Sequence, residues 1–374
     1  MPQKLKYGML LLFAVVLACK GNLPQNTASS NLPTLPENEA ALGRYFFFDK
    51  RLSYRQMTSC ASCHAPQFAF TDSYRRSLTF STERVRRNSS SLVNVGNYHY
   101  FTWANLQLTE IEQQLRHPFF INIPLEMGSI KDTTAILHTL AEDAFYQESI
   151  ANLFPQKTMS WQIIFRCLAA YCRALNSYNA PYDKFVQTND SSLLSSDALE
   201  GMALFFADSI ACAKCHAGNN FSIAATEQAT PENAFANIGL YNVDMLNEYP
   251  NLDKGVIMIT NNPDDDGRFR IPMLRNLLFT APYFHDGSVE TLNEVIDIHA
   301  QGGRNIKYGP LKGNGIVNEC KDPRLQTFII SENKKRSIAA FLYALTDSSI
   351  LHNPFFKMPD YFAQKPTDNN SYYE

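Results

Sequence analysis

The sequence has little excess charge and no long apolar run. Its 374 residues include 33 Lys and Arg and 36 Asp and Glu, a net charge of −3. This balance excludes the basic surface that nucleic-acid-binding proteins need, and no acidic tail is present. Strand signals are few, and the apolar run at residues 9–18 is too short for a stable membrane span. The length leaves room for two domains with cores of their own.

The first residues are typical of an export signal. Lys4 and Lys6 precede the apolar run, and Cys19 follows Val-Leu-Ala. This order is similar to the bacterial lipoprotein cleavage box, so we expect a signal peptide at residues 1–19, a lipid anchor on Cys19 and a periplasmic location. Simple signal cleavage nearby, with loss of Cys19, is the alternative. Residues 20–37 are rich in Asn, Pro, Ser and Thr and are expected to form a disordered tether.

Four of the eight cysteines stand in two C-x-x-C-H motifs. The motif residues are Cys60, Cys63 and His64 in the first and Cys212, Cys215 and His216 in the second. This is the attachment signature of c-type haem, in which the thiols bond the vinyl groups and the histidine binds the iron. A zinc site or a redox dithiol is the alternative for a C-x-x-C pair. Neither needs a histidine after each second cysteine, so we expect two covalent haems.

Three further cysteines lie outside the motifs and the lipid-anchor position. Cys167 and Cys172 are five residues apart on an expected helix. They therefore face different sides, and we expect small core residues rather than a disulfide. Cys320 has no evident partner.

A repeated apolar segment organises the chain. Residues 41–47 and 200–206 each form an expected short helix before a C-x-x-C-H motif. The repeat predicts a mainly α fold of two tandem cytochrome-c-like helical domains, each holding one covalent haem. The expected boundaries are residues 38–189 for the N-terminal haem domain, 190–350 for the C-terminal haem domain and 351–374 for a tail on the surface. Periodicity predicts helices over 161–177 and 334–345 and a helix cap at Ser196 or Asp197, and residues 255–260 are a candidate strand.

Several stretches beyond the haem motifs resemble one family. They are Arg87-Asn88-Ser89, Phe101-Thr102-Trp103-Ala104-Asn105, Glu112-Gln113-Gln114, Leu125-Glu126-Met127-Gly128, Phe269-Arg270-Ile271-Pro272-Met273-Leu274-Arg275-Asn276 and Leu278 to Ser288 (LFTAPYFHDGS). Together they are similar to the bacterial di-haem cytochrome c peroxidase and MauG superfamily over about residues 38–356. The Trp-Ala-Asn stretch is closer to the MauG-like branch, which includes the methanobactin-associated enzyme, since peroxidases proper usually have Trp-Asp-Gly there.

The resemblance implies that hydrogen peroxide reacts at the N-terminal haem, whose iron needs an open position. Peroxidases proper have a histidine in the loop after the first motif, but residues 65–87 contain none. MauG-like members lack it too, so we expect an iron that takes peroxide without prior reduction. A sixth ligand from His99 or His117 is the alternative.

The resemblance also implies a distal carboxyl and amide at this haem. Glu126 matches the family's distal glutamate, which would move a proton during O–O cleavage with a pKa raised by desolvation. Gln113 keeps the family's spacing from Trp103, whereas Gln114 keeps the spacing to Pro118, and either could be the distal glutamine. The glutamine-to-glutamate spacing is a few residues longer than usual, so a solvated loop carboxylate at Glu126 is the alternative.

His299 occupies the position of the family's sixth ligand to the second iron, which is methionine in peroxidases and tyrosine in MauG. Ligation by His216 and His299 would give a lower potential than a histidine and methionine pair. An ordinary core or surface histidine is the alternative at this position, and Met273 and Met258 are weaker ligand candidates. His285 matches a family histidine expected to be structural or part of the haem environment.

Two further features are implied between the haems. Trp103 matches the tryptophan that relays electrons in the family. The family's calcium ion would take the Asn88 side chain and the carbonyl groups of Thr280 and Pro282, with waters, as oxygen ligands. Residues 264–266, three aspartates, are interpreted as a solvated turn rather than a second cation site.

These features predict a di-haem c-type peroxidase, an oxidoreductase acting on hydrogen peroxide. Oxidising equivalents would pass through Trp103 and the second haem to an electron donor, a cytochrome c or a small copper protein. A MauG-like enzyme that oxidises Trp or Tyr of a partner protein is the alternative. A di-haem electron-transfer cytochrome is the alternative of another class, and no residues remain for the signalling module of a haem sensor. We expect no nucleic-acid partner and membrane contact only through the anchor at Cys19.

Overall fold

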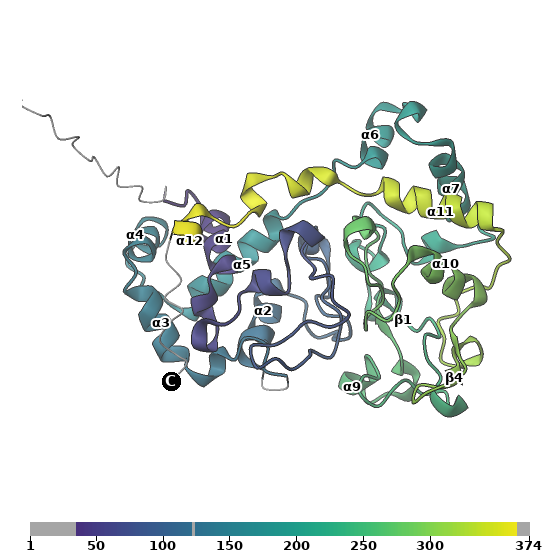
Figure 1. Ribbon diagram of the computed structural model, residues 1–374, viewed down its shortest axis with the longest axis horizontal. Helices are drawn as coiled ribbons and strands as arrows, with labels where there is room; N and C mark the ends of the chain where they lie inside the picture. Colours follow the sequence, from purple (N-terminus) through teal and green to yellow (C-terminus); the bar gives the residue numbers. More distant parts are fainter. Residues whose placement is uncertain (1–34, 122–123, 365–374) are drawn as a thin grey trace, which may run out of the picture. The chain divides into compact units, whose positions relative to one another are not determined.

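Helices dominate the computed structural model, which describes residues 35–121 and 124–364. They are α1 (Glu39–Phe48), α2 (Ile111–Phe120), α3 (Thr133–Ala141), α4 (Ala144–Leu153), α5 (Trp161–Ala174), α6 (Pro181–Thr188), α7 (Ser196–Phe206), α8 (Pro231–Ala234), α9 (Ile257–Thr260), α10 (Leu292–Gln301), α11 (Glu332–Ala344) and α12 (Asp360–Gln364) (Figure 1). Antiparallel two-residue strands pair β1 (Phe235–Ala236) with β2 (Phe269–Arg270) and β3 (Asn305–Ile306) with β4 (Gly313–Asn314). The mainly α fold class is confirmed. The signal peptide and Cys19 lie outside the described residues.

Short polar side chains begin the longer helices. The hydroxyl of Ser160 accepts a hydrogen bond from the third amide of α5, and Ser331 does the same for α11. These caps satisfy amides that lack a partner in the first turn. The cap of α7 is Ser195, whose hydroxyl accepts from the amide of Ala198 (3.1 Å). The expected cap at Ser196 or Asp197 is therefore wrong by one or two residues. No helix in the described ranges has the length and apolarity to cross a membrane.

Each repeated segment packs a glycine against a second helix. In α1, a methyl group on Gly43 would overlap the carbonyl of Cys167 in α5. In α7, a methyl group on Gly201 would overlap the carbonyl of Ser337 in α11. Glycine allows this close approach because it has no Cβ atom. Each haem motif therefore follows the first helix of an equivalent pair, α1 with α5 or α7 with α11.

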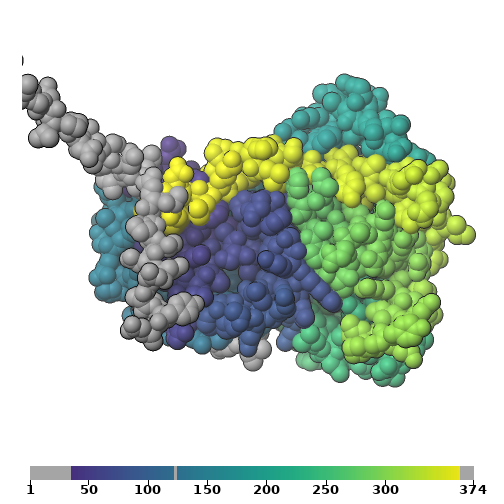
Figure 2. Space-filling model, in the orientation of Figure 1, coloured from purple at the N-terminus to yellow at the C-terminus, as the bar shows by residue number. Residues whose placement is uncertain are grey.

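Three apolar clusters form the core. The first joins α1 and α5 to the C-terminal segment, whose Phe356 is buried against Phe70. Figure 2 shows this segment (yellow) lying against N-terminal residues (purple). The second cluster combines residues from both halves of the chain, such as Tyr98 and Ala169 with Phe235 and Phe269. The third surrounds Phe205 and Phe341 of α7 and α11. The described part of the 351–374 tail therefore contributes to the core as well as to the surface.

The expected strand at residues 255–260 is wrong. Ile257–Thr260 forms the short helix α9, which ends at Asn261 in the left-handed region (φ 56°). The run is apolar, but Met258 and Ile259 are exposed and only its first two residues are buried. Because β-branched residues favour strands only where a neighbouring strand is present to pair, the local contacts decide against their propensity.

Candidate functional site

The first C-x-x-C-H motif forms a single turn. The amide of His64 donates to the carbonyl of Cys60 (2.9 Å), which brings the thiols and the imidazole to one place. The Nδ1 atom of His64 lies 3.0 Å from the carbonyl oxygen of Phe70 and 3.2 Å from Oγ of Ser89. A carbonyl only accepts hydrogen bonds, so Nδ1 carries the proton. This leaves the Nε2 lone pair of His64 available to a metal ion.

The second motif repeats this geometry. The amide of His216 donates to the carbonyl of Cys212 (2.9 Å), and Nδ1 of His216 lies 3.0 Å from the carbonyl oxygen of Phe221. Burial lowers the pKa of His216 to about 4, and His299 contributes to the lowering. Burial also lowers the pKa of His64. Both imidazoles are therefore neutral near pH 7, which is the form that binds iron.

The four motif thiols are free and partly buried. Burial raises the pKa of Cys63 and of Cys212 to about 12 and that of Cys215 to about 11. Such thiols remain protonated, whereas a redox dithiol or a zinc ligand needs a thiolate. In the described residues, no group of three or more His, Cys, Asp and Glu side chains could hold a metal ion. The described residues thus offer no preformed zinc site, and the raised thiol pKa is the opposite of what a redox dithiol needs.

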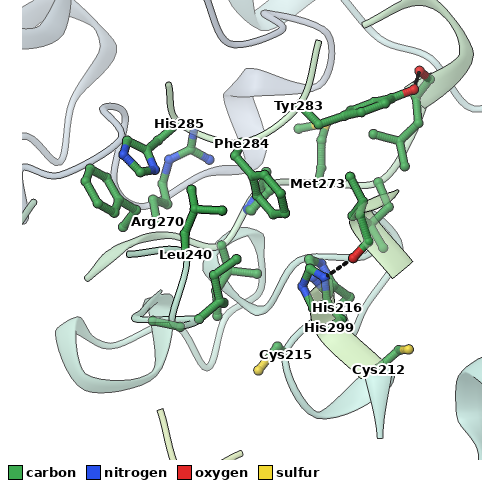
Figure 3. A pocket seen from close by; sticks show the side chains of 18 of the residues that line it. Cys212, Cys215, His216, Leu240, Arg270, Met273, Tyr283, Phe284, His285 and His299 are labelled. Carbon is green, nitrogen blue, oxygen red and sulfur yellow. Dashed lines mark hydrogen bonds between the residues drawn. The ribbon is translucent and has the colours of Figure 1, made fainter. Parts of the chain in front are cut away.

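His299 faces the second motif across a cavity of about 240 Å³. It lies on α10, and its Nδ1 donates to the carbonyl of Val295 (2.8 Å), one turn earlier. Its Nε2 is therefore also left for a ligand bond. Figure 3 shows His216 and His299 close together beside Cys212 and Cys215. Met273 lines the same cavity, whereas Met258 does not and is 44 % exposed.

A second cavity, of about 170 Å³, adjoins the first motif. Glu126, Gln114 and His117 line it together with His64. Gln114 has a buried Oε1 atom with no partner among the described residues, while Gln113 on the same helix is exposed. Of the two candidate glutamines, the structure thus brings only Gln114 to the cavity. Of the two alternative ligands, His117 lines the cavity and His99 is exposed outside it.

Three backbone hydrogen bonds hold Glu126 at this cavity. The amide of Phe80 donates to the carbonyl of Glu126 (3.1 Å), while the next residue, Met127, donates to Pro118 (3.0 Å) and accepts from Tyr54 (2.9 Å). Glu126 is exposed and lines the cavity, and desolvation by the protein around its carboxyl raises the pKa to about 7. The longer spacing before Glu126 does not remove it from the cavity. Its side chain is exposed in a loop, so the alternative of a solvated loop carboxylate stays open beside the acid role.

Residues 88–91 separate the two cavities. Ser90 lines both, and Ser89, which contacts His64, also lines the larger one. Trp103 lines the larger cavity and its Nε1 donates to the carbonyl of Asn88 (2.9 Å). A short path therefore runs from Trp103 through Asn88 and Ser89 to His64. Thr280 and Pro282, the other two expected calcium ligands, line the same cavity as Asn88.

The Asn88 amide is oriented by its neighbours. Its Nδ2 donates to the carbonyl of Tyr74 (3.0 Å), so Oδ1 is left to accept or to bind a cation. His285 is buried near Asn88. Its ring stacks on that of Phe269, with the ring centroids 3.4 Å apart. Its backbone carbonyl accepts from the amide of Asn88 (2.7 Å), and its side chain lines the larger cavity. The structural or haem-environment role of that side chain stays a prediction.

The interpretation of residues 264–266 as a solvated turn holds for Asp264, which is exposed, but is wrong for Asp265 and Asp266. Asp265 pairs with Arg268, and Asp266 accepts a hydrogen bond from the amide of Tyr249 (2.9 Å). Both are at most 6 % exposed. Burial of the two carboxylates is possible because each has a partner: the Arg268 guanidinium for Asp265 and the Tyr249 amide for Asp266.

The cavities fit the haems that the motifs imply. Each is far larger than the roughly 10–15 Å³ that holds one water. Each has two thiols and an imidazole with a free Nε2 at one wall. Arg270 lines the larger cavity, is 3 % exposed, and has a buried Nη1 atom without a partner in the described part of the chain. Such a buried cation needs an anion, and a haem carboxylate would provide it.

Comparison with known proteins decides the family. The family model for di-haem cytochrome c peroxidase matches residues 37–191. The crystal structure of a MauG-like protein associated with microbial copper homeostasis has a TM-score of 0.83 and 36 % identity, over 87 % of this chain and 94 % of that one. The chain belongs to the di-haem cytochrome c peroxidase and MauG family. Membership makes it an oxidoreductase of a family with two c-type haems.

Members of both branches are similar to the chain at lower identity. The cytochrome-c peroxidase IdrP2 of Denitromonas iodatirespirans is 27 % identical over 87 % of this chain and 88 % of its own length. The methylamine utilization protein MauG of Methylorubrum extorquens is 29 % identical over 84 % and 79 %. The sequence identities to the peroxidase and to MauG are therefore nearly the same, and they do not separate the two branches.

Three residues that line the cavities, Arg270, His117 and Cys172, were not predicted to do so from the sequence. Arg270 was quoted only as part of a family motif, and His117 only as an alternative ligand. Cys172 lies in the core as expected, and it also lines the smaller cavity, where it adds to the effect of burial in raising the pKa of Cys60. The spacing of Gln114, His117 and Pro118 could have placed His117 at the cavity, because residues three and four apart on a helix share a face.

Proposed function

We propose that the chain is a di-haem c-type peroxidase that reduces hydrogen peroxide in the cavity of His64. The observation that carries the proposal is the meeting of Glu126 and Gln114 with His64 in one cavity. The bound haems would supply the redox chemistry, an iron that takes peroxide and a second iron that takes electrons from a donor. The remaining steps belong to side chains of this chain.

Glu126 would move the proton that O–O cleavage requires. A pKa of about 7 leaves the carboxyl protonated in a large fraction of molecules at neutral pH. A group with a pKa near the working pH both gives and takes a proton readily. Gln114 would hold the peroxide, because its buried Oε1 atom accepts a hydrogen bond and finds none in the described residues.

Trp103 would carry electrons between the two sites. Its hydrogen bond to Asn88 and the contact of Ser89 with His64 support a short path. The Arg270 guanidinium lies 5.8 Å from the Trp103 ring centroid and 3.7 Å from that of Tyr98. A cation at a ring face disfavours a positive charge on the ring, so Arg270 would make Trp103 harder to oxidise and limit loss of electrons from it.

We also infer a calcium ion between the haems and a lipid anchor. Asn88, Thr280 and Pro282 line one cavity and offer the oxygen ligands that calcium prefers. Cys19 would attach the chain to the periplasmic side of the envelope. A cytochrome c or a small copper protein would then be the electron donor.

A MauG-like role is the second candidate. Two observations favour it: residues 65–87 contain no histidine, and the similarity to the MauG-like copper-homeostasis protein reaches 36 % identity. In this role the oxidising equivalents would modify a Trp or Tyr of a partner protein.

One experiment separates the two roles. One equivalent of peroxide is added to the fully oxidised protein without reductant, and the ferric electron paramagnetic resonance signals and the near-infrared absorption are followed. Loss of both ferric signals with a long-lived near-infrared band supports the MauG-like role. A reaction only after one haem is reduced supports the peroxidase role. No reaction in either state refutes both.

A further inference from the structure

The cavity of His64 contains a second acid-base side chain. His117 lies on α2, three residues after Gln114 and one before Pro118, and all three line the cavity. Residues with this spacing share a face of a helix. The hydrogen bond from Met127 to the carbonyl of Pro118 (3.0 Å) ties the Glu126 segment to the same end of α2. One helix face and one pinned loop therefore present an imidazole, an amide and a carboxyl to a common space.

His117 differs from the three histidines assigned to iron. Each of His64, His216 and His299 has its Nδ1 held by a backbone carbonyl at 2.8–3.0 Å. Within the described ranges, no hydrogen bond holds the ring of His117. An iron ligand needs a held ring, because the bond to Nδ1 sets its tautomer and orientation. A general base needs one ring nitrogen with a free lone pair within reach of the proton, and the unbonded ring of His117 offers either nitrogen.

The surroundings of His117 keep it uncharged. Burial alone lowers its pKa, with no contribution from a neighbouring charge. The other titratable groups that line the cavity are Glu126, His64 and the thiols of Cys60, Cys63 and Cys172. The thiols are protonated and His64 is neutral, so Glu126 is the single carboxyl among them. An imidazole base and a carboxylic acid are thus available together near pH 7.

We propose that His117 is a catalytic base, and this rests on the proposed peroxide chemistry. His117 takes the proton from one oxygen of hydrogen peroxide, while Glu126 gives its proton to the other oxygen. The O–O bond breaks, and the oxygen that received the proton leaves as water. The other oxygen takes two electrons from the haem centres and two protons from solvent and leaves as a second water. Return of the proton from His117 to Glu126 restores both groups.

Cyanide binding tests the base without turnover. Hydrogen cyanide must lose its proton to bind ferric haem, so a base in the cavity accelerates the reaction. The holoenzyme with both haems is compared with its His117→Gln and His117→Glu variants at pH 7, and the rate of cyanide binding is followed in the Soret band. The control is His138→Gln, because the His138 side chain is 70 % exposed on α3.

The expected result is a cyanide-binding rate that falls at least about tenfold in His117→Gln and partly recovers in His117→Glu. The rate of His138→Gln should match the unmodified holoenzyme. A His117→Gln rate within twofold of the unmodified rate overturns the proposal. So does a change of the N-terminal haem from low spin to high spin in His117→Gln, because His117 would then be an iron ligand. Absence of peroxide turnover in the unmodified enzyme would refute the proposed function instead, and the cyanide rates would still report on His117.

Discussion

Replacement of Glu126 by Gln gives the sharpest test of the peroxide site. Gln keeps the size of the side chain but cannot donate or accept the proton. A positioned general acid contributes roughly 100- to 10,000-fold to a rate, so peroxide turnover should fall by that factor. The pKa of about 7 also sets the pH profile. The acid must be protonated, so turnover by the unmodified enzyme should fall about tenfold for each pH unit above 7.

The assay is kcat/KM for peroxide between pH 5 and 9, with a reduced cytochrome c as donor. Glu126→Gln should lose the decline above pH 7 as well as the rate. Glu142→Gln is the matched control, because the Glu142 side chain is 69 % exposed and remote from the cavity residues. Turnover that is unimpaired in Glu126→Gln, or a decline near pH 7 that survives in it, would refute the acid role.

The same pKa predicts how stability changes with pH. Burial raises the pKa of Glu126, so the folded chain keeps a proton that the unfolded chain loses at lower pH. Between the ordinary glutamate pKa and about 7, the unfolded state binds fewer protons, and stability should fall as the pH rises. Glu126→Gln lacks this dependence, so its melting temperature relative to the unmodified protein should increase from pH 5 to pH 7. An unchanged difference would contradict burial as the cause of the raised pKa.

Three further changes test other parts of the structure. His299→Ala should alter the absorption and paramagnetic resonance spectra of the C-terminal haem, and an unchanged spectrum means that His299 is not its ligand. Gly201→Ala should destabilise the protein by about 1–3 kcal/mol, because the new methyl group overlaps the Ser337 carbonyl. Thermal unfolding measures this against Ala203→Ser on the exposed face of α7, and equal melting temperatures would contradict the packing. Asn88→Ala should weaken calcium binding in isothermal titration, and an unchanged affinity would remove that site.

Local sequence patterns were sufficient to predict the haem-attachment motifs and the two longest helices. The C-x-x-C-H spacing places two thiols and an imidazole on one turn through backbone bonds alone, as at Cys60 and His64. The helix expected at 161–177 is α5 (Trp161–Ala174), because an amphipathic stretch with a serine before it needs no distant partner to be recognised. The helix expected at 334–345 is α11 (Glu332–Ala344) for the same reason.

Distant contacts decided the features that were wrong or left open. Residues 255–260 have strand propensity, but no strand of the described residues pairs with them, and Ile257–Thr260 form α9. The choice between Gln113 and Gln114 depends on which face of α2 meets the cavity, which spacing from Trp103 or Pro118 could not show.

The sequence by itself therefore determined the family, the two haem-attachment motifs and the mainly helical fold, since each follows from short spacings and periodicity. Only the tertiary structure decided which polar groups share a cavity. Burial of Asp265, the free Nη1 of Arg270 and the meeting of His117 with Glu126 all depend on segments far apart in the chain. Their energies arise from loss of water around charged and polar groups, and that loss is set by packing rather than by neighbours in sequence.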